Sequence, residues 1–516
     1  MLHETLAEML KMNNPSRFYL MFLTLSVTFG GVVFGYHMAV ISGAIASLKE
    51  FFIDPFGWPE GIANSRLGLV VSSALFGCIA GASSGGLISR YLGRKTGLLI
   101  AALLLLLSAT GSAMPELFFR PIGEADHTFV TAFVVYRIIG GFGVGLGMLV
   151  PLYIAEIAPA GIRGKLVSLT HFAIILGVLV AYFVNYSIAR QGEDAWLHQV
   201  GWRWMFASET IPALLFAILL LMVPETPRYY VMKGSESKAL KVLSRINGTE
   251  EARAILLDIK ATFADTGSPS KKNRGKLFTG KLNGLFAFGP KVIVIGVLIP
   301  VIVHLSGINV ILYYAPVIFS DMGTKTDASL LSTIFVGAVT LLFAIPAVFT
   351  VDRFGRKPLL KIGAIVMAVA MGLLGFTFFL GMNETVIGGE VISQFTSRFA
   401  AVSALTLILI FVAGFSMSWG PVGGVVTSEI FPNRIRGRAL ALAATFSSIA
   451  NLVVTWTFPV LNNSSFLVDR FNHGAAYWIY GVVACLALYF LRFVPETKQK
   501  TLEEIESYWR KKSKEK

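Results

Sequence analysis

The residues of this chain that could do chemistry are charged side chains in three short motifs, each of which occurs twice. RYLGRK at 90–95 recurs in shortened form as RFGRK at 353–357, EIAPAGIRG at 156–164 recurs as EIFPNRIRG at 429–437, and PETPR at 224–228 recurs as PETK at 495–498. Opposite charges in such motifs can form ion pairs, and because one exposed pair contributes only about 0–1 kcal/mol, only a network of them can bias a conformation. Three motif pairs in the same order indicate an internal duplication.

Further ionisable residues stand inside long apolar stretches, namely His37, Arg137, His171 and His304. Ionisable groups inside a membrane are costly and are functional by default. Two interpretations of the three histidines stay open: a pH-sensitive, anion-binding or metal-conducting site, or neutral side chains that each hydrogen-bond to a hydroxyl. The sequence shows neither metal-ligand spacing on one helix nor a nucleophile with its base. We therefore expect neither an enzyme nor a bound metal or other cofactor.

The composition places most of the chain in lipid. Hydrophobic residues make up 55% of the 516 residues and charged residues 14%, against about 25% charged residues in a soluble domain. This excludes a soluble enzyme, a disordered chain and a secreted disulfide scaffold. The net charge of +14 lies in a few loops between apolar stretches, which is typical of cytoplasmic loops and argues against a nucleic-acid partner. No GxxxxGK[ST] motif supports ATP-driven transport.

Twelve apolar stretches are long enough to cross the bilayer, which takes about 20 helical residues. We expect spans near 18–46, 65–89, 96–114, 131–155, 165–189, 203–223, 290–319, 328–350, 358–381, 400–428, 439–460 and 475–494. Loops rich in Arg and Lys alternate with acidic or mixed loops, so the basic side is predicted to be cytoplasmic, with both termini on it. The expected location is a cell membrane, which is the inner membrane in a bacterium.

The one long basic connection divides the chain into two halves. The expected domains are a cytoplasmic segment 1–17, a six-helix bundle 18–223, a cytoplasmic helical segment 224–289, a second six-helix bundle 290–494 and a cytoplasmic tail 495–516. Within the long connection, 235–262 has helical spacing and 265–276 is a polar linker. The predicted fold class is an all-α membrane protein of twelve transmembrane helices in two pseudo-symmetric bundles, with a small cytoplasmic helical domain.

Two parallel six-helix repeats with a site between them describe a secondary transporter that works by alternating access. The repeated charged motifs lie at cytoplasmic helix ends, where opposite charges are expected to bridge the halves and hold the inner gate shut. The residues of this inner-gate network are Arg94, Glu156, Arg163, Glu225, Arg356, Glu429, Arg436 and Glu496.

At this level of detail the chain resembles the sugar porter family of the major facilitator superfamily, and most of all its bacterial D-xylose–proton symporters. The resemblance covers roughly residues 20–505 and includes the RxGRK loops, PETPR, PETK, GINVILYY at 307–314 and SWGPV at 418–422. It implies the major facilitator fold, a monomer in the lipid bilayer and a central cavity that binds a polyol. The implied partners are a small solute, expected to be a saccharide, and protons if transport is coupled.

The resemblance also implies a set of substrate-binding positions. Phe34, Asn309 and Tyr313 match the family. The positions that depart from it are His171 and Val178 in place of Gln, Val303 and His304 in place of a Gln-Gln pair, Thr340 in place of Asn, Gly424 in place of Trp, and Ser447 with Ser448 in place of a Gln-Trp pair. The lost amides and indoles predict a wider pocket with fewer donors, which suits a disaccharide, a glycoside or a non-sugar solute better than free xylose or glucose.

His37 is the departure with the largest consequence, because proton-coupled relatives carry an Asp there. Arg137, which pairs with that Asp in the symporters, is retained. A histidine beside an arginine is expected to be neutral, since like charges repel, although His titrates near physiological pH. Proton coupling by another route and uniport both stay open. A transport-dead sensor is disfavoured by the short tail after Pro495.

Overall fold

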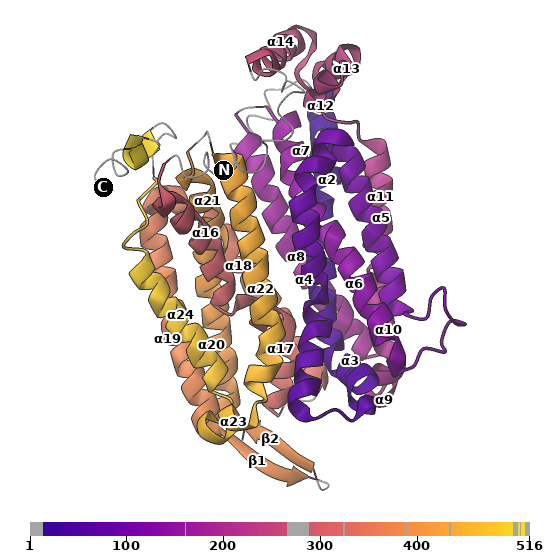
Figure 1. Cartoon of the computed structure of the whole chain (residues 1–516), viewed down its shortest axis with the longest axis vertical. Coiled ribbons are helices and arrows are strands. Elements are labelled where there is room, and N and C mark those ends of the chain that lie inside the picture. Colours follow the sequence, from indigo (N-terminus) through magenta and orange to yellow (C-terminus); the bar gives the residue numbers. More distant parts are fainter. Residues whose placement is uncertain are drawn as a thin grey trace.

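The computed structural model describes residues 14–159, 161–265, 288–323, 326–387, 390–395, 397–432, 435–498, 504–505 and 507–510. Residues 1–13 of the predicted N-terminal segment, residues 266–276 of the predicted linker and most of the tail beyond 498 lie outside them. The described chain forms two helical bundles side by side, with the N-terminal half in indigo to magenta and the C-terminal half in orange to yellow (Figure 1).

The N-terminal half is built from long apolar helices. The first is α2 (Asn14–Ala39), which continues through 3-10 and short helical turns to α3 (Ile45–Leu48). The next are α4 (Glu60–Tyr91), α5 (Arg94–Ala113), α6 (Val130–Gly145) with α7 (Leu149–Ile157), and α8 (Arg163–Ala189). The last is a run of α9 (Asp194–Trp196), α10 (Trp202–Ser208) and α11 (Thr210–Met222). Three helices follow at one end of the bundle: α12 (Pro227–Met232), α13 (Glu236–Asn247) and α14 (Thr249–Asp265).

The C-terminal half repeats this arrangement. Its elements are α16 (Pro290–Leu305), α17 (Ile308–Asp321), α18 (Thr326–Phe354), α19 (Arg356–Gly381), strands β1 (Met382–Ile387) and β2 (Glu390–Phe395), α20 (Arg398–Met417), α21 (Trp419–Ile430), α22 (Arg436–Asn462), α23 (Ser465–Phe471) and α24 (Ala475–Phe490). We call the end that carries α12–α14 the basic end, and the end that carries β1 and β2 the hairpin end (Figure 1).

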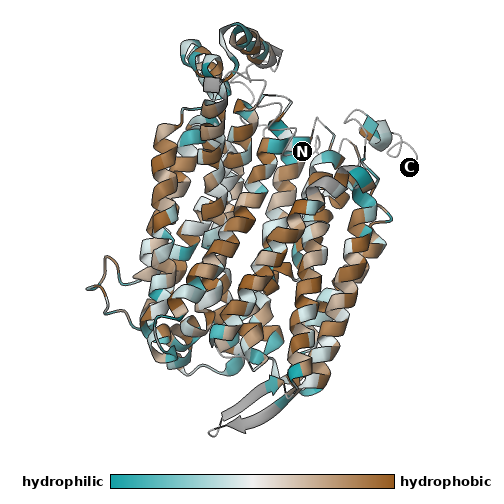
Figure 2. Ribbon diagram, turned by 180° about the vertical axis from the view of Figure 1, so that it is seen from behind, coloured by the Kyte–Doolittle hydropathy of each residue, from teal (hydrophilic) through white to brown (hydrophobic). Residues whose placement is uncertain are grey.

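The predicted spans are confirmed in outline. Among the described residues, eleven helices are long and apolar enough to cross a membrane, and a twelfth span arises if α23 and α24, bent by 79° at their junction, count as one. In Figure 2 hydrophilic residues gather at the two ends, and hydrophobic residues cover the middle of both bundles. The sixth span begins at Asp194 rather than at 203, because turns of π-helix and α-helix extend it through a less apolar segment.

The antiparallel hairpin of β1 and β2 was not expected from the sequence. Met382 pairs with Phe395, and Ile387 with Glu390. The signal was present, since the Gly388-Gly389 dipeptide stands between two short β-branched runs, which is a typical hairpin pattern. The predicted helices of 235–262 are confirmed as α13 and α14.

The seventh span is broken where its polar residues lie. Gly307 has φ +87° and separates α16 from α17. This left-handed conformation suits glycine, because a side chain there would be strained. A Cβ on Gly307 would also lie 2.6 Å from the ring of Tyr480. The break brings His304, at the end of α16, next to Asn309 in the first turn of α17.

Candidate transport site

The N-terminal half contains a fully buried polar cluster of three side chains. His37 Nδ1 donates to Glu209 Oε1 at 2.8 Å, and both side chains have 0% exposure. Arg137 is 1% exposed, and its Nη1 and Nη2 donate to the backbone oxygen of His37 at 3.2 Å. The arginine therefore contacts the backbone of His37, while the imidazole contacts a carboxylate. With a neutral ring the cluster has no net charge, and one added proton makes it +1.

Glu209 is a buried carboxylate that the sequence analysis missed. It comes from the sixth span, 172 residues from His37. The signal that could have found it is a single acidic residue inside an apolar stretch, which marks a functional site by default. Within the described residues, His37 Nε2 and Glu209 Oε2 lack a hydrogen-bond partner. A buried polar atom without a partner destabilises the fold. A proton or another ligand that bound to these two atoms would supply the missing partner.

A second polar cluster lies in the C-terminal half, around the break in the seventh span. Asn309 Nδ2 donates to His304 Nδ1 at 2.5 Å and to Asn451 Oδ1 at 2.8 Å. Thr455 Oγ1 donates to the same Asn451 oxygen at 3.2 Å. Because an amide nitrogen only donates, His304 Nδ1 accepts, and the proton of a neutral ring then sits on Nε2. Donors and acceptors of this kind suit a polyol.

The structure brings together some of the predicted binding positions and separates others. Asn309 and His304 are in contact, and Tyr313 follows one turn later on α17. The sequence analysis missed Asn451 of α22, although an amide within an apolar span was the signal that could have found it. Phe34 packs in the core of the N-terminal half, with its ring 6.0 Å from that of Phe216. We therefore find packing, rather than contact with the polar clusters, at that position.

The other predicted positions differ in their surroundings, and Val178 and Val303 pack against the hydrophobic core. A Cβ on Gly424 would meet no atom within 4 Å, and both Gly424 and His171 are exposed although they lie within apolar spans. Val178 and Val303 are half-buried. Thr340 Oγ1 donates to Val336 of its own helix at 2.7 Å, and Ser447 Oγ donates to the Pro300 oxygen at 3.3 Å. Gly424 thus has open space beside it, and the wider pocket stays a prediction.

The two halves contact each other from the hairpin end to the middle of the bundle. Asn463 Nδ2 donates to Asn64 Oδ1 at 3.3 Å, and Trp456 Nε1 donates to the Ser65 oxygen at 3.0 Å. Gly68 permits this packing, because a Cβ there would lie 2.1 Å from the Trp456 oxygen. On the other side of the interface, Tyr182 OH donates to the Leu312 oxygen at 2.6 Å. These contacts form a closed gate at the hairpin end.

We expect Trp456→Phe to weaken this gate. One hydrogen bond contributes about 0.5–1.5 kcal/mol, so the ratio of closed to open forms should fall by about 2- to 12-fold. Distances between spin labels on Glu60 and Ser465, measured by pulsed electron resonance, would show a larger long-distance population. Trp478→Phe is the matched control, because Trp478 Nε1 donates to Gly372 within one half at 3.2 Å. An equal shift in both variants would contradict the assignment.

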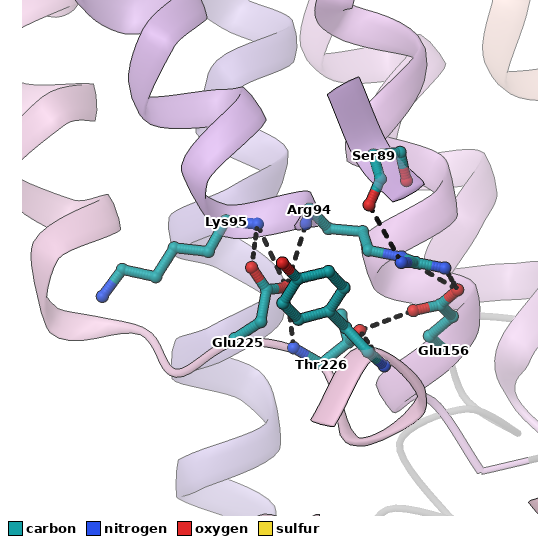
Figure 3. Close-up of polar contacts among 7 residues, drawn as sticks. Ser89, Arg94, Lys95, Glu156, Glu225 and Thr226 are labelled. Atoms are coloured by element: carbon teal, nitrogen blue, oxygen red, sulfur yellow. Dashed lines mark hydrogen bonds and ion pairs between the residues drawn. The ribbon is translucent and has the colours of Figure 1, made fainter. Parts of the chain in front are cut away.

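At the basic end, the first set of repeated motifs forms one network (Figure 3). Glu225 accepts the backbone N–H groups of Arg94 at 3.0 Å, Lys95 at 3.0 Å and Thr226 at 2.9 Å. Arg94 Nη2 donates to Glu156 Oε1 at 2.8 Å, and Thr226 Oγ1 donates to Glu156 Oε2 at 2.6 Å. The carboxylate of Glu225 therefore caps the start of α5, where backbone donors are free.

The second set of motifs forms the same network in the C-terminal half. Glu496 accepts the backbone N–H groups of Arg356 at 3.1 Å and Lys357 at 2.9 Å. Arg356 Nη2 donates to Glu429 Oε1 at 3.1 Å, and Thr497 Oγ1 donates to Glu429 Oε2. The equivalent atoms make equivalent bonds in both halves, as an internal duplication predicts.

In this structure each of these ion pairs lies within its own half, and the expected bridging between the halves stays a prediction. Arg94 and Glu156 both belong to the first bundle, and Arg356 and Glu429 to the second. Of the other predicted network members, Arg163 donates to the Ala158 oxygen at 3.5 Å and Arg436 to the Phe431 oxygen at 3.2 Å. The sequence could not show that the motifs also serve as internal braces.

The two capping carboxylates differ in acidity. Burial raises the pKa of Glu225, although three backbone donors oppose the shift. Burial acts in the same direction on Glu496, but four backbone donors outweigh it and lower its pKa. Acidification therefore protonates Glu225 before Glu496, so the brace of the N-terminal half weakens first.

Known proteins are similar to this chain over nearly its whole length. The family model described as "Sugar (and other) transporter" matches residues 23–509. The D-xylose-proton symporter of Escherichia coli (strain K12) is 48% identical over 500 residues, covering 95% of this chain and 96% of that protein. The glucose facilitated diffusion protein of Zymomonas mobilis is 38% identical over 490 residues, covering 95% and 97%.

Solved structures of the xylose transporter XylE from E. coli are similar throughout. Its inward open conformation gives a TM-score of 0.81 at 45% identity, covering 95% of this chain and 100% of that one. The major facilitator superfamily proton:xylose symporter XylE bound to 6-bromo-6-deoxy-D-glucose gives 0.75 at 47% identity, covering 95% and 99%. With its duplicated bundles and closed hairpin end, the chain therefore belongs to the sugar transporter family of the major facilitator superfamily and is a membrane transporter rather than an enzyme.

Proposed function

We propose that this protein carries a saccharide across the cell membrane by alternating access and couples that movement to protons. The observation that carries the coupling is the buried His37–Glu209 pair beside Arg137. It adds a carboxylate to the histidine that the sequence offered as a proton-coupling candidate. The basic end is proposed to be cytoplasmic, with both termini on that side, since basic loops favour the cytoplasm.

The proposed saccharide site lies between the halves, next to the Asn309 cluster. Asn309, His304 and Asn451 supply donors and acceptors, and Tyr313 supplies an aromatic surface. The other proposed lining positions are His171, Val178, Val303, Thr340, Gly424 and Ser447. In the proposed orientation the structure faces the cytoplasm, because its closed gate lies at the hairpin end. The similarity to an inward open conformation supports the same orientation.

The proposed transport cycle exchanges one closed gate for the other. Opening the hairpin end breaks the Asn64–Asn463 and Trp456–Ser65 contacts. We propose that the charged motifs of the two halves then approach each other and close the basic end. In that state the arginines of one half can reach the carboxylates of the other, so the network would serve as a brace in one state and as a gate in the other.

Uptake into proteoliposomes tests the proposal directly. Radiolabelled pentoses, hexoses, disaccharides and sugar acids would be offered with and without an inward proton gradient. We expect accumulation of at least one saccharide above its external concentration, abolished by an ionophore. Equilibration that is indifferent to the gradient would leave saccharide transport standing and remove the coupling. No uptake of any saccharide would overturn the substrate class.

Gly424 is expected to set the upper size limit of the substrate. Because a Cβ there meets no atom within 4 Å, Gly424→Trp should fold and fill the open space. We expect it to reduce disaccharide uptake by more than tenfold while monosaccharide uptake stays within about threefold. Gly372→Trp, also free of neighbours, is the control. Equal losses for both substrate sizes would contradict this role.

A further inference from the structure

The connection between α5 and α6 presents a group of apolar side chains that the described part of the chain leaves largely exposed. Phe118, Phe119 and Ile122 are 80%, 70% and 65% exposed. Single exposed apolar residues need no explanation, but three at the tip of one loop mark an interaction site. The loop projects sideways from the N-terminal bundle near α10 in both views (Figures 1 and 2).

The loop is held in this position by a buried ion pair at its base. Arg203 Nη1 donates to Glu116 Oε1 at 2.9 Å, and the Glu116 side chain has 0% exposure. Gly123 N donates to the same Glu116 oxygen at 2.6 Å, which closes the loop on itself. Tyr136 OH donates to the Leu117 oxygen at 3.1 Å. The base is therefore fixed to α6 and α10. At the tip, Phe119 lies near Phe129, with ring centroids 6.4 Å apart, and the Arg120 guanidinium lies 5.1 Å from the centre of the same ring.

The backbone at the tip is shaped so that both phenylalanines point outward. Phe118 has φ +74°, a conformation that is unfavourable for a bulky side chain. Such strain persists where the surroundings enforce it and often marks a functional position. Here the turn directs apolar rings away from the core, which only an apolar environment outside the protein would favour.

The length of α5 indicates which environment this is. α5 has 20 residues, whereas the neighbouring runs His127–Ile157 and Asp194–Met222 have 31 and 29. The Ala113 oxygen at the end of α5 accepts from Arg203 Nη1 at 3.2 Å. Arg203 lies about 13 Å along its helical run from Asp194, at 1.5 Å per residue. α5 is therefore about as long as the hydrocarbon core is thick, so the loop leaves the bundle at the edge of that core.

The surrounding surface is continuous with the lipid-facing side of the bundle. Trp204, next to Arg203, is 60% exposed, and Leu103 of α5 is 57% exposed. Exposed tryptophan is typical of the membrane interface. The loop satisfies part of its own backbone, since Phe119 N donates to the Glu116 oxygen at 2.8 Å and Glu124 N to the Pro121 oxygen at 3.2 Å. Arg120 pairs with Asp126 at 3.1 Å and adds charge suited to the headgroup layer rather than the hydrocarbon core.

We propose that residues 117–123 form a lipid anchor, in which Phe118, Phe119 and Ile122 insert into the interface of the bilayer leaflet at the hairpin end. In the proposed orientation this is the outer leaflet. The occupant is phospholipid rather than a second protein chain, because the tip lies beside the lipid-facing surface of the bundle and at the level where α5 reaches the membrane interface. The anchor fixes the α5–α6 connection, and through Glu116 the start of α10, relative to the membrane surface.

Spin-label accessibility in lipid nanodiscs tests the anchor. Labels would be placed singly by Phe118→Cys, Phe119→Cys and Ile122→Cys in a Cys485→Ser background, in which the remaining Cys78 is buried. Leu103→Cys serves as the lipid-exposed control and Glu193→Cys, on an exposed turn, as the water-exposed control. We expect each tip label to collide with oxygen several-fold more than with a water-soluble nickel complex, as the Leu103 label does.

Two outcomes would overturn the proposal. Tip labels whose ratio of oxygen to nickel collisions equals that of the Glu193 label would place the loop in water. Tip labels shielded from both reagents would show that protein covers the tip, as in contact with a second copy. Three separate label positions keep the test decisive if one variant fails to fold. None of these outcomes depends on whether the protein carries a saccharide or couples to protons.

Discussion

Glu209→Gln is expected to abolish proton-driven accumulation while leaving saccharide exchange intact. Glutamine keeps the shape of glutamate and a hydrogen bond to His37, but it cannot bind and release a proton. With one coupled proton, a gradient of one pH unit supports about a tenfold accumulation, since a factor of ten corresponds to about 1.4 kcal/mol. Uptake by the variant should fall to equilibration, with counterflow of labelled saccharide within about threefold of the wild-type rate.

The matched control for this prediction is another buried carboxylate of the same half. Glu116 has 0% exposure and pairs with Arg203, as Glu209 pairs with His37, but it lies outside the proposed proton site. Glu116→Gln should therefore keep accumulation, even if its thermal stability falls. Accumulation by Glu209→Gln at the wild-type ratio would remove Glu209 from the coupling mechanism.

His37→Asn separates the two members of the pair. If the proton is shared between imidazole and carboxylate, both variants should lose accumulation. Loss in Glu209→Gln with retention in His37→Asn would place the proton on the carboxylate alone. The imidazole would then only orient Glu209. Either result distinguishes this cluster from a mechanism that relies on a single carboxylate at position 37.

Asn309→Ala is expected to weaken saccharide binding by about 5- to 150-fold. Its amide nitrogen donates to both His304 and Asn451. The substitution removes the donor to His304 Nδ1 and leaves Asn451 Oδ1 with the hydroxyl of Thr455 alone among the described contacts. Stranding a buried polar group costs about 1–3 kcal/mol, and the direct contact to a solute hydroxyl is lost as well. Counterflow measured over a range of saccharide concentrations would show the weaker binding as a raised KM.

Asn185→Ala is the control for loss of a buried amide as such. Asn185 Nδ2 donates to the Val40 oxygen at 2.9 Å within the N-terminal half, away from the Asn309 cluster. We expect a lower melting temperature but a KM within about twofold of the wild type. A wild-type KM in Asn309→Ala would show that the cluster organises the helix break without contacting the solute.

The amino-acid sequence by itself determined the architecture. Apolar stretches of about 20 residues and the alternation of loop charge are local properties, so they give the spans and the division into halves. The repeated motifs likewise predict two equivalent sets of charged residues, because Arg94 and Glu225 in one half correspond in order to Arg356 and Glu496 in the other. The two short strands were not predicted, and the sixth span was predicted to begin at 203 instead of Asp194, since local composition at both places is mixed.

Only the tertiary structure decided which polar side chains meet. His37 and Glu209 are 172 residues apart, and Asn309 and Asn451 are 142 apart. Their contacts depend on how each helix is rotated and tilted in the bundle, which no local pattern encodes. The same holds for the gates: charge pattern placed Arg94 and Glu156 at one end, but packing decided that they brace one half and that Trp456 closes the other end.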